Sequence, residues 1–259
     1  MSGGGGVVRG DGAGTNAGGT DAADSNGRRA WVLAIDTATS RIVVAAATPE
    51  GELLGVTTWE AGRTHGEQLL PAIGRLHGEA NLRRSRIRGV IVGTGPGAFT
   101  GLRVGLATAK ALAHELGVPI VGVATGEALL RAAAAAQGMD ATDGAARIDR
   151  IALLLPAGPN DRHLVRHGAE PRLLPGGEEP ELGAGDVVVA VDLSGRAPED
   201  ALVRGEAARA GLAAALVALG VPRLAAGGDD LARLVPEYVS LPRGVRAESG
   251  EVAWSRDPR

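Results

Sequence analysis

The stretch that most constrains the fold is VIVGTGPGAFTGLRVGLATAKALA, which spans residues 90–113. It begins with a short apolar run of β-branched residues, typical of a strand that is covered on both faces. The G-P-G segment ends this strand, because such a turn needs backbone angles and close approaches that side chains would block. Thr100 is placed to cap a following helix. We therefore predict a buried strand, a tight turn and a helix.

The predicted helix is apolar or small around most of its circumference. One stripe is formed by Leu102, Leu106, Ala109, Ala113 and Leu116. Its flanks hold Gly101, Gly105, Ala107 and Ala111. A helix with this composition is buried on more than one side. It therefore lies deep inside the chain, or another protein covers its second face.

Composition excludes several classes of function. The chain has 259 residues and a formal net charge of -3, so no global basic field holds nucleic acid unaided. It has no cysteine, which excludes disulfides, a thiol nucleophile and a thiolate metal site and is compatible with the cytoplasm. No apolar run approaches the roughly 20 residues of a membrane helix. We expect a cytoplasmic protein that does not enter a membrane.

The chain is long enough for one large domain or two small ones. Residues 1–29 are rich in Gly, Ala, Asp and Asn, and we expect a disordered tail there. Residues 30–136 form the first predicted subdomain. A polar segment that begins at residue 137 opens a second, smaller subdomain that extends to residue 245. The remaining residues, 246–259, are polar, and we expect a loose C-terminal tail.

The first predicted subdomain opens with three apolar segments, residues 31–35, 41–48 and 52–59. The breaks between them are too short for crossover helices, so we predict an antiparallel meander. A helical pattern follows over residues 65–82, with Pro71 in its first two turns. The strand, turn and helix described above come next, and a further strand spans residues 119–124. The order is therefore βββαβα, with another helix from residue 126.

The second half also mixes strands and helices. Residues 151–157 and 162–168 flank a GPND turn, which predicts a hairpin. A segment expected to be mostly loop leads to a strand at residues 186–193. An Ala-rich helix follows over residues 198–219, which Gly220 and Pro222 are expected to end. This order matches the α/β fold of actin, sugar kinases and Hsp70, with two RNase H-like subdomains, although nuclease-like sheets can open in the same way.

Three segments carry a family resemblance. They read WVLAIDTAT, HGEQLLPAI and GVIVGTGPGAFTGLRVGLATAKALAHELGVPIVGVATGEAL, in this order. Over residues 31–130 the chain resembles the TsaB (YeaZ-like) family, and VPEYVSLP near the C-terminus resembles that family's last strand. The middle segment, IDRIALLLPAGPNDRHLV, departs from the family pattern and keeps only its strands. The resemblance implies a non-catalytic scaffold subunit needed to make N6-threonylcarbamoyladenosine (t6A) on tRNA.

The resemblance also implies partners. These are the catalytic paralogue TsaD and the ATPase TsaE, with no cofactor of the chain's own and with ATP or ADP entering only at the level of the complex. The family's contact surface lies on its first two helices, here residues 67–76 and 100–116. The candidate interface residues are Leu69, Leu70, Ile73, Leu76, Phe99, Leu102, Arg103, Leu106 and Lys110. A homodimer through the same helices is an alternative.

We expect any contact with tRNA to be indirect or weak. Such a contact could come from the basic cluster Arg83, Arg84, Arg86 and Arg88, which could meet phosphates or remain solvated.

Two short motifs could bind phosphate. Asp36 and Thr37 follow the first strand, where an actin-like fold places its first phosphate loop, and Asp36 could hold a hydrated metal. The alternative is an Asp that caps its own turn. Gly95 and Gly97 could cradle a phosphate at a helix N-terminus, but no Lys-Ser/Thr pair follows them. The alternative there is a tight turn that leads into an interface helix.

No catalytic or metal-binding residue is predicted. His163 and His167 are four residues apart, but they lie on an expected hairpin and lack the Glu of the zinc-peptidase helix. No G-x-S-x-G elbow occurs. A stand-alone actin-fold ATPase or kinase and a metallopeptidase remain alternatives, which nucleotide or metal binding by the purified chain would reveal.

Overall fold

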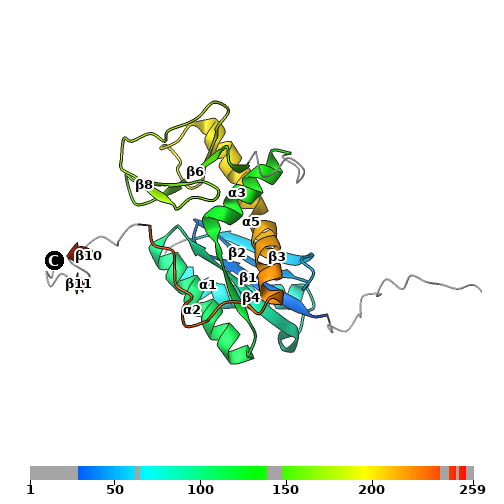
Figure 1. Cartoon of the computed structure of the whole chain (residues 1–259). Helices are drawn as coiled ribbons and strands as arrows, with labels where there is room; N and C mark the ends of the chain where they lie inside the picture. The colour runs from blue at the N-terminus through cyan, green and yellow to red at the C-terminus, as the bar shows by residue number, and fades with distance from the viewer. Residues whose placement is uncertain (1–28, 62–64, 139–147, 240–244, 249–250, 255–259) are drawn as a thin grey trace, which may run out of the picture.

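The first lobe is built on a five-stranded sheet with the strand order β3-β2-β1-β4-β5. The structure is a computed structural model that describes residues 29–61, 65–138, 148–239, 245–248 and 251–254 (Figure 1). The strands are β1 (Trp31–Asp36), β2 (Arg41–Ala47), β3 (Leu53–Glu60), β4 (Ile87–Gly95) and β5 (Ile120–Ala124). β1, β2 and β3 pair antiparallel, which confirms the predicted meander, whereas β4 is parallel to β1 and β5 is parallel to β4.

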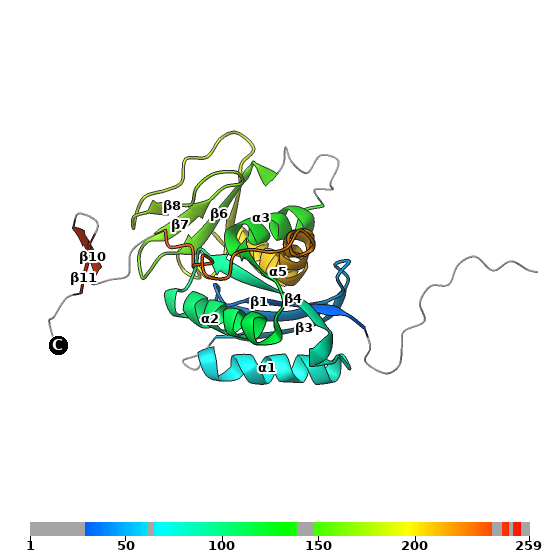
Figure 2. The same ribbon diagram turned by 60° about the horizontal axis from the view of Figure 1, so that its bottom comes forward.

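Helices cover both faces of this sheet (Figure 2). α1 (His65–Glu79) and α2 (Phe99–Leu116) lie on one face, and α3 (Thr125–Ala136) and α5 (Glu199–Ala225) lie on the other. Successive strand residues point to opposite faces. Accordingly, Leu33 and Ile35 of β1 pack on the α1 and α2 side, while Val32 and Ala34 pack on the α3 and α5 side.

One local expectation about the helices of the first lobe differs from the structure. α2 begins at Phe99 after Ala98, without a side-chain cap, so Thr100 is the second helical residue and not the predicted cap. Pro71 lies inside α1, which continues to Glu79. A short 3₁₀ helix, η1 (Arg84–Arg86), then leads into β4.

The second lobe is a four-stranded sheet with the order β8-β7-β6-β9. Its strands are β6 (Ile151–Pro156), β7 (Arg162–Val165), β8 (Arg172–Leu174) and β9 (Val187–Ala190). β6 and β7 form the predicted hairpin, and β9 is parallel to β6. β8 lies in the segment that we expected to be mostly loop. The sequence did not reveal this strand, because its three residues are too few to show the alternation of a strand.

α3 and α5 lie between the two sheets, and their side chains form one apolar cluster with both. Val32 and Val43 enter this cluster from the first lobe, and Leu153 and Val189 enter it from the second. α5 follows the second sheet in sequence, yet it also packs against the first. The core is therefore shared between the lobes.

α5 is longer than predicted. It continues through Gly220 and Pro222 to Ala225. A Cβ added at Gly220 would lie 2.7 Å from Ile91, so this glycine allows the helix to approach the sheet closely. The expectation that no segment is long and apolar enough to cross a membrane is wrong for α5 by length and composition. Half of its apolar window is buried inside the protein, between the sheets, as in the core helix of a folded domain.

Near the C-terminus, where we expected only a loose tail from residue 246, two short strands pair antiparallel. They are β10 (Val245–Glu248) and β11 (Glu251–Trp254). The N-terminal tail predicted at residues 1–29 lies almost wholly outside the described residues, which begin at residue 29.

Candidate functional site

Asp36 is the last residue of β1, and its carboxylate is enclosed by other residues of the chain. Its Oδ1 accepts a hydrogen bond from the amide of Ala38 at 2.8 Å, and its Oδ2 accepts one from the hydroxyl of Thr125 at 2.7 Å. The side chain is fully buried. Burial raises the pKa of Asp36 to about 6, although both hydrogen bonds act in the opposite direction. The Ala38 bond is the one made by an Asp that caps its own turn.

The glycine segment packs directly on this turn. The hydroxyl of Thr37 donates to the carbonyl of Gly101 at 2.7 Å. A Cβ at Gly97 would lie 2.2 Å from the carbonyl oxygen of Ala38, and one at Gly105 would lie 2.1 Å from the hydroxyl of Thr37. The absence of side chains at these glycines therefore lets the N-terminus of α2 approach the β1–β2 turn.

The structure thus brings together the two phosphate motifs that the sequence indicated separately. Asp36, Thr37 and the segment with Gly95 and Gly97 meet where β1, β4 and α2 come together, and we call this region the joint. The side chains of Asp36 and Thr37 and the amide of Gly95 are, however, hydrogen-bonded within the chain itself. Of the four candidate residues, Gly97 lines a cavity beside the joint, and Gly95 is buried under Leu102 with a positive φ of 107°.

The cavity beside the joint has a volume of about 680 Å³ and lies between the lobes. Its polar lining residues are Thr39, Ser40, His163, Asp192, Glu237 and Tyr238. No lysine or arginine is among the described residues that line it. Burial lowers the pKa of His163, and burial together with nearby Glu170 raises the pKa of Glu237. The described lining side chains therefore offer carboxylates and an imidazole with a lowered pKa, and they offer no guanidinium or ammonium group to pair with a phosphate.

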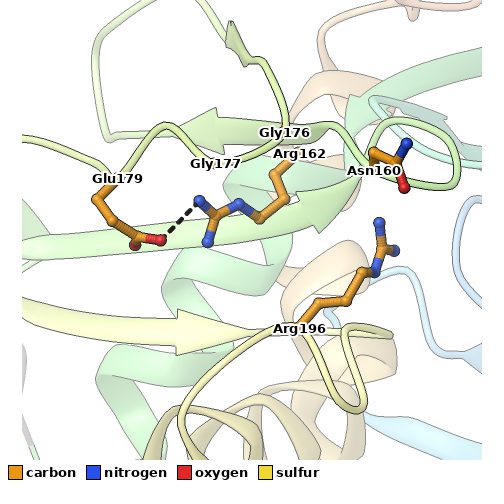
Figure 3. Close-up of a pocket in the computed structure, with 6 residues that line it drawn as sticks. All are labelled: Asn160, Arg162, Gly176, Gly177, Glu179 and Arg196. Atoms are coloured by element: carbon orange, nitrogen blue, oxygen red, sulfur yellow. Dashed lines mark hydrogen bonds and ion pairs between the residues drawn. The ribbon is translucent and has the colours of Figure 1, made fainter.

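A second cavity, of about 410 Å³, lies in the second lobe beside Arg162 and Arg196 (Figure 3). The Arg162 guanidinium points toward Glu179 and pairs with its carboxylate at 3.1 Å. The Arg196 guanidinium points the other way, toward Asn160, and donates to the carbonyls of Gly158 and Pro159 at 2.9 Å. Because the two groups do not converge, they hold loops of this lobe in place and do not form an anion site.

Four of the nine predicted interface residues on α1 and α2 are buried by the chain itself. The exposed fractions are 0% for Leu69, 3% for Leu76, 1% for Leu102 and 5% for Leu106. Leu69, Leu76 and Leu106 belong to the core under the first sheet. These four assignments are therefore corrected, because the apolar sides of α1 and α2 are buried against the chain's own core and are not free for another protein.

Three further predicted interface residues contact the segment that follows α5. The guanidinium of Arg103 lies 3.8 Å above the ring of Phe99 and donates to the Tyr238 hydroxyl at 3.0 Å. Lys110 donates to the carbonyl of Leu234 at 3.1 Å. Residues 229–239 thus form a strap across α2 and the edge of β5, and we refer to this segment as the strap. Phe99, Arg103 and Lys110 are bound within the chain.

The exposed residues of α1 and α2 include one leucine and several small residues, besides charged and polar side chains such as Arg75 and Arg103. Leu70 is 59% exposed on α1, and Ile73 is partly buried. Gly74 and Gly78 follow Leu70 at intervals of four, and a Cβ at either glycine would meet nothing within 4 Å. On α2, which contacts α1, Ala107 and Ala111 are exposed. We call Leu70, Gly74, Gly78, Ala107 and Ala111 the α1–α2 face. The two glycines were missed, although glycines four apart in a predicted helix are a readable signal.

The remaining candidates are separate from this face. His167 contacts the carboxylate of Glu127 at 2.9 Å, whereas His163 lines the larger cavity. Within the described ranges, no three His, Asp or Glu side chains gather as a metal site. The basic cluster at residues 83–88 lies on η1 and the start of β4, where Arg83, Arg84 and Arg88 are exposed.

Comparisons with known proteins agree with these motifs. Residues 40–144 match the family model described as "TsaD: tRNA N6-adenosine threonylcarbamoyltransferase". An uncharacterized protein of Mycobacterium leprae is 40% identical over 101 residues, which are 38% of this chain and 28% of that protein. The tRNA threonylcarbamoyladenosine biosynthesis protein TsaB of Haemophilus influenzae is 33% identical over 102 residues, which are 39% of this chain and 42% of that protein. The chain therefore spans less than half the length of these curated relatives.

The fold is shared over a larger part of the chain. The solved structure of YeaZ from Pseudomonas aeruginosa matches with a TM-score of 0.60 and 22% identity, over 81% of this chain and 99% of that one. This likeness confirms the predicted α/β fold, which the chain shares with the YeaZ structure. Together with the relative named TsaB, it also confirms the resemblance to the TsaB (YeaZ-like) family.

Proposed function

We propose that this TsaB-like chain is a non-catalytic scaffold subunit needed for t6A formation on tRNA, and that it binds a TsaD-like paralogue through the α1–α2 face. The relative named TsaB and the TsaD family model support the pathway. Both matches cover only part of the chain or of the relative, so the partner and the role of this chain are our inference.

The observation that carries the proposal is the pair of glycines on the exposed side of α1. A glycine inside a helix costs about 1 kcal/mol relative to alanine. Nothing in the part of the chain that the structure describes requires Gly74 or Gly78, because a Cβ at either position would meet no atom there within 4 Å. A second helix packed closely on α1 would require them, since backbones approach only where side chains are small. Leu70, on the same side, would supply apolar contact area.

The non-catalytic role is supported by the chemistry of the joint and of the larger cavity. Asp36 and Thr37, which an actin-like ATPase would use for phosphate, are bonded to the chain's own Ala38, Thr125 and Gly101. The described residues that line the larger cavity include Asp192 and Glu237 and no lysine or arginine. Nucleotide chemistry would therefore belong to other subunits, with TsaE as the ATPase of the complex and ATP or ADP bound there.

The test is co-purification of this chain with the TsaD of the same organism. We expect Leu70→Asp to weaken the complex at least tenfold, because a buried carboxylate would have no partner at the interface. The matched control is Val203→Asp on α5, where the valine is 61% exposed and distant from the α1–α2 face. Both variants should keep the unfolding midpoint of the parent chain, since both side chains face solvent.

Equal binding by Leu70→Asp and the parent would refute the assignment of the interface. Calorimetry of the isolated chain with ATP and Mg²⁺ addresses the rival function. Saturable nucleotide binding with turnover would favour a stand-alone ATPase over a scaffold subunit. A homodimer through the same face would appear as a Leu70→Asp-sensitive dimer in the absence of TsaD.

A further inference from the structure

A network of hydrogen-bonded and ion-paired side chains joins the two lobes beside the larger cavity. Ser40 belongs to the turn between β1 and β2, and Asp192 follows β9 of the second lobe. The amide of Ser40 donates to Oδ2 of Asp192 at 2.6 Å, and its hydroxyl is 2.6 Å from Oδ1. Ser40 and Asp192 are 152 residues apart in the chain, so this contact is a direct link between the lobes.

Arg209 of α5 completes the network. Its Nη1 donates to Oδ1 of Asp192 at 2.7 Å, and its Nη2 donates to Oε1 of Glu60, at the end of β3, at 2.6 Å. The side chains of Arg209 and Asp192 are only 7% and 11% exposed. Hydrogen bonds between ionised groups are stronger than neutral ones, and screening by salt is weak for buried pairs. The network therefore resists separation of the lobes more than an exposed ion pair would.

The backbone of Asp192 is consistent with a role that depends on its side chain. Asp192 has a φ of 58°, in the left-handed region that glycine adopts without cost. Holding a residue with a Cβ there carries a conformational cost, which is smaller for Asp than for most residues. Glycine would relieve this cost but would lose the carboxylate that Ser40 and Arg209 share.

We propose that Ser40, Glu60, Asp192 and Arg209 form an interlobe clamp that holds the two sheets at one separation. Ser40 and Asp192 also line the 680 Å³ cavity, so the clamp fixes the width of that cavity. An actin-like fold with a clamp of this kind does not open and close as a hinged enzyme does. The protein then presents its surfaces to a partner as one rigid body.

Spin labels on the two lobes test the proposal, because the chain has no cysteine of its own. Labels at Glu79→Cys on α1 and Ala184→Cys in the second lobe report the distance between lobes by double electron–electron resonance. We expect a narrow distribution in the parent and one about twice as wide in Arg209→Met. Exchange of the Ser40 amide should rise about tenfold in the same variant, because that amide loses a fixed acceptor.

The matched control is Arg204→Met, on the same helix. Arg204 pairs with Asp200 at 2.7 Å and donates to the carbonyl of Val188, so its bonds stay within the second lobe and α5. This variant should keep the narrow distribution. If Arg209→Met does not fold, two milder variants remain. Asp192→Asn removes the charge of the shared carboxylate, and Ser40→Ala removes the hydroxyl bonded to it; both should still broaden the distribution. An unchanged distribution in folded clamp variants, or a broad one in the parent, would overturn the proposal.

Discussion

Gly93 of β4 faces the carboxylate of Asp36 so closely that a Cβ on Gly93 would lie 1.8 Å from Oδ2. The same Cβ would lie 2.8 Å from the hydroxyl of Thr125, which donates to Asp36. The geometry of a phosphate-binding loop is therefore not needed to explain this glycine. It makes room for a buried carboxylate between two parallel strands.

The first prediction concerns this contact. We expect Gly93→Ala to lower the free energy of unfolding by about 2–3 kcal/mol, because the added methyl group must displace a buried, hydrogen-bonded side chain. Gly74→Ala is the matched control, since its methyl group would enter open space on α1 and should raise stability by up to about 1 kcal/mol. Urea unfolding of both variants measures the difference, and equal stabilities would contradict the packing described here.

The second prediction is a pH dependence that arises from Asp36. Burial raises its folded-state pKa from 3.8 to about 6, so the folded state binds more protons than the unfolded state between these values. The contribution of Asp36 to the unfolding free energy therefore falls as the pH rises from about 4 to about 6. Asp36→Asn removes this titration.

Denaturant unfolding of the parent and of Asp36→Asn from pH 4 to pH 7 measures this effect. The difference between the two free energies of unfolding should shift in favour of the variant by about 1–3 kcal/mol as the pH rises. Other groups titrate in both proteins and cancel in the difference. Parallel pH profiles would show that Asp36 is not held in the buried environment found here.

The third prediction separates the two sides of the helices that cover the first sheet. Leu102 is 1% exposed, whereas Leu70 is 59% exposed. Leu102→Asp should unfold the chain or cost more than about 3 kcal/mol, because it buries an unpaired carboxylate. Leu70→Asp should change the unfolding free energy by less than about 0.5 kcal/mol. Circular dichroism with thermal unfolding distinguishes the two, and a stable Leu102→Asp protein would show that this face of α2 is accessible.

The fourth prediction tests the strap. Asp229 accepts a hydrogen bond from the amide of Gly122 at 2.9 Å and pairs with Arg223 at 2.8 Å. Leu234 packs so closely on Gly122 that a Cβ there would lie 2.4 Å from it. Leu234→Ala should lower stability by about 2 kcal/mol. Proteolysis within the strap should become faster in this variant, while Val235→Ala, which changes a 63% exposed residue, should leave the rate unchanged.

The local sequence pattern was sufficient to predict most of the secondary structure of the first lobe. The meander, the strand–turn–helix unit and the hairpin of the second lobe follow from alternation, helical spacing and turn residues, all of which act over a few neighbouring positions. The end of α5 was not predictable in this way. Gly220 and Pro222 are ordinary helix-ending signals, and only the contact of Gly220 with Ile91 shows why the helix continues.

The sequence by itself determined that α2 is an apolar helix with small flanks, following a glycine turn. Only the tertiary structure decided which side of it is free, because a helix with two buryable sides can place either one on its sheet. Leu102 and Leu106 are buried in the core, and Lys110 donates a hydrogen bond to a backbone carbonyl of the strap. The contact between Ser40 and Asp192 could not be predicted from the sequence either, since no periodic pattern links residues that are 152 positions apart. Contacts between distant segments depend on how whole elements pack, and local spacing does not contain that information.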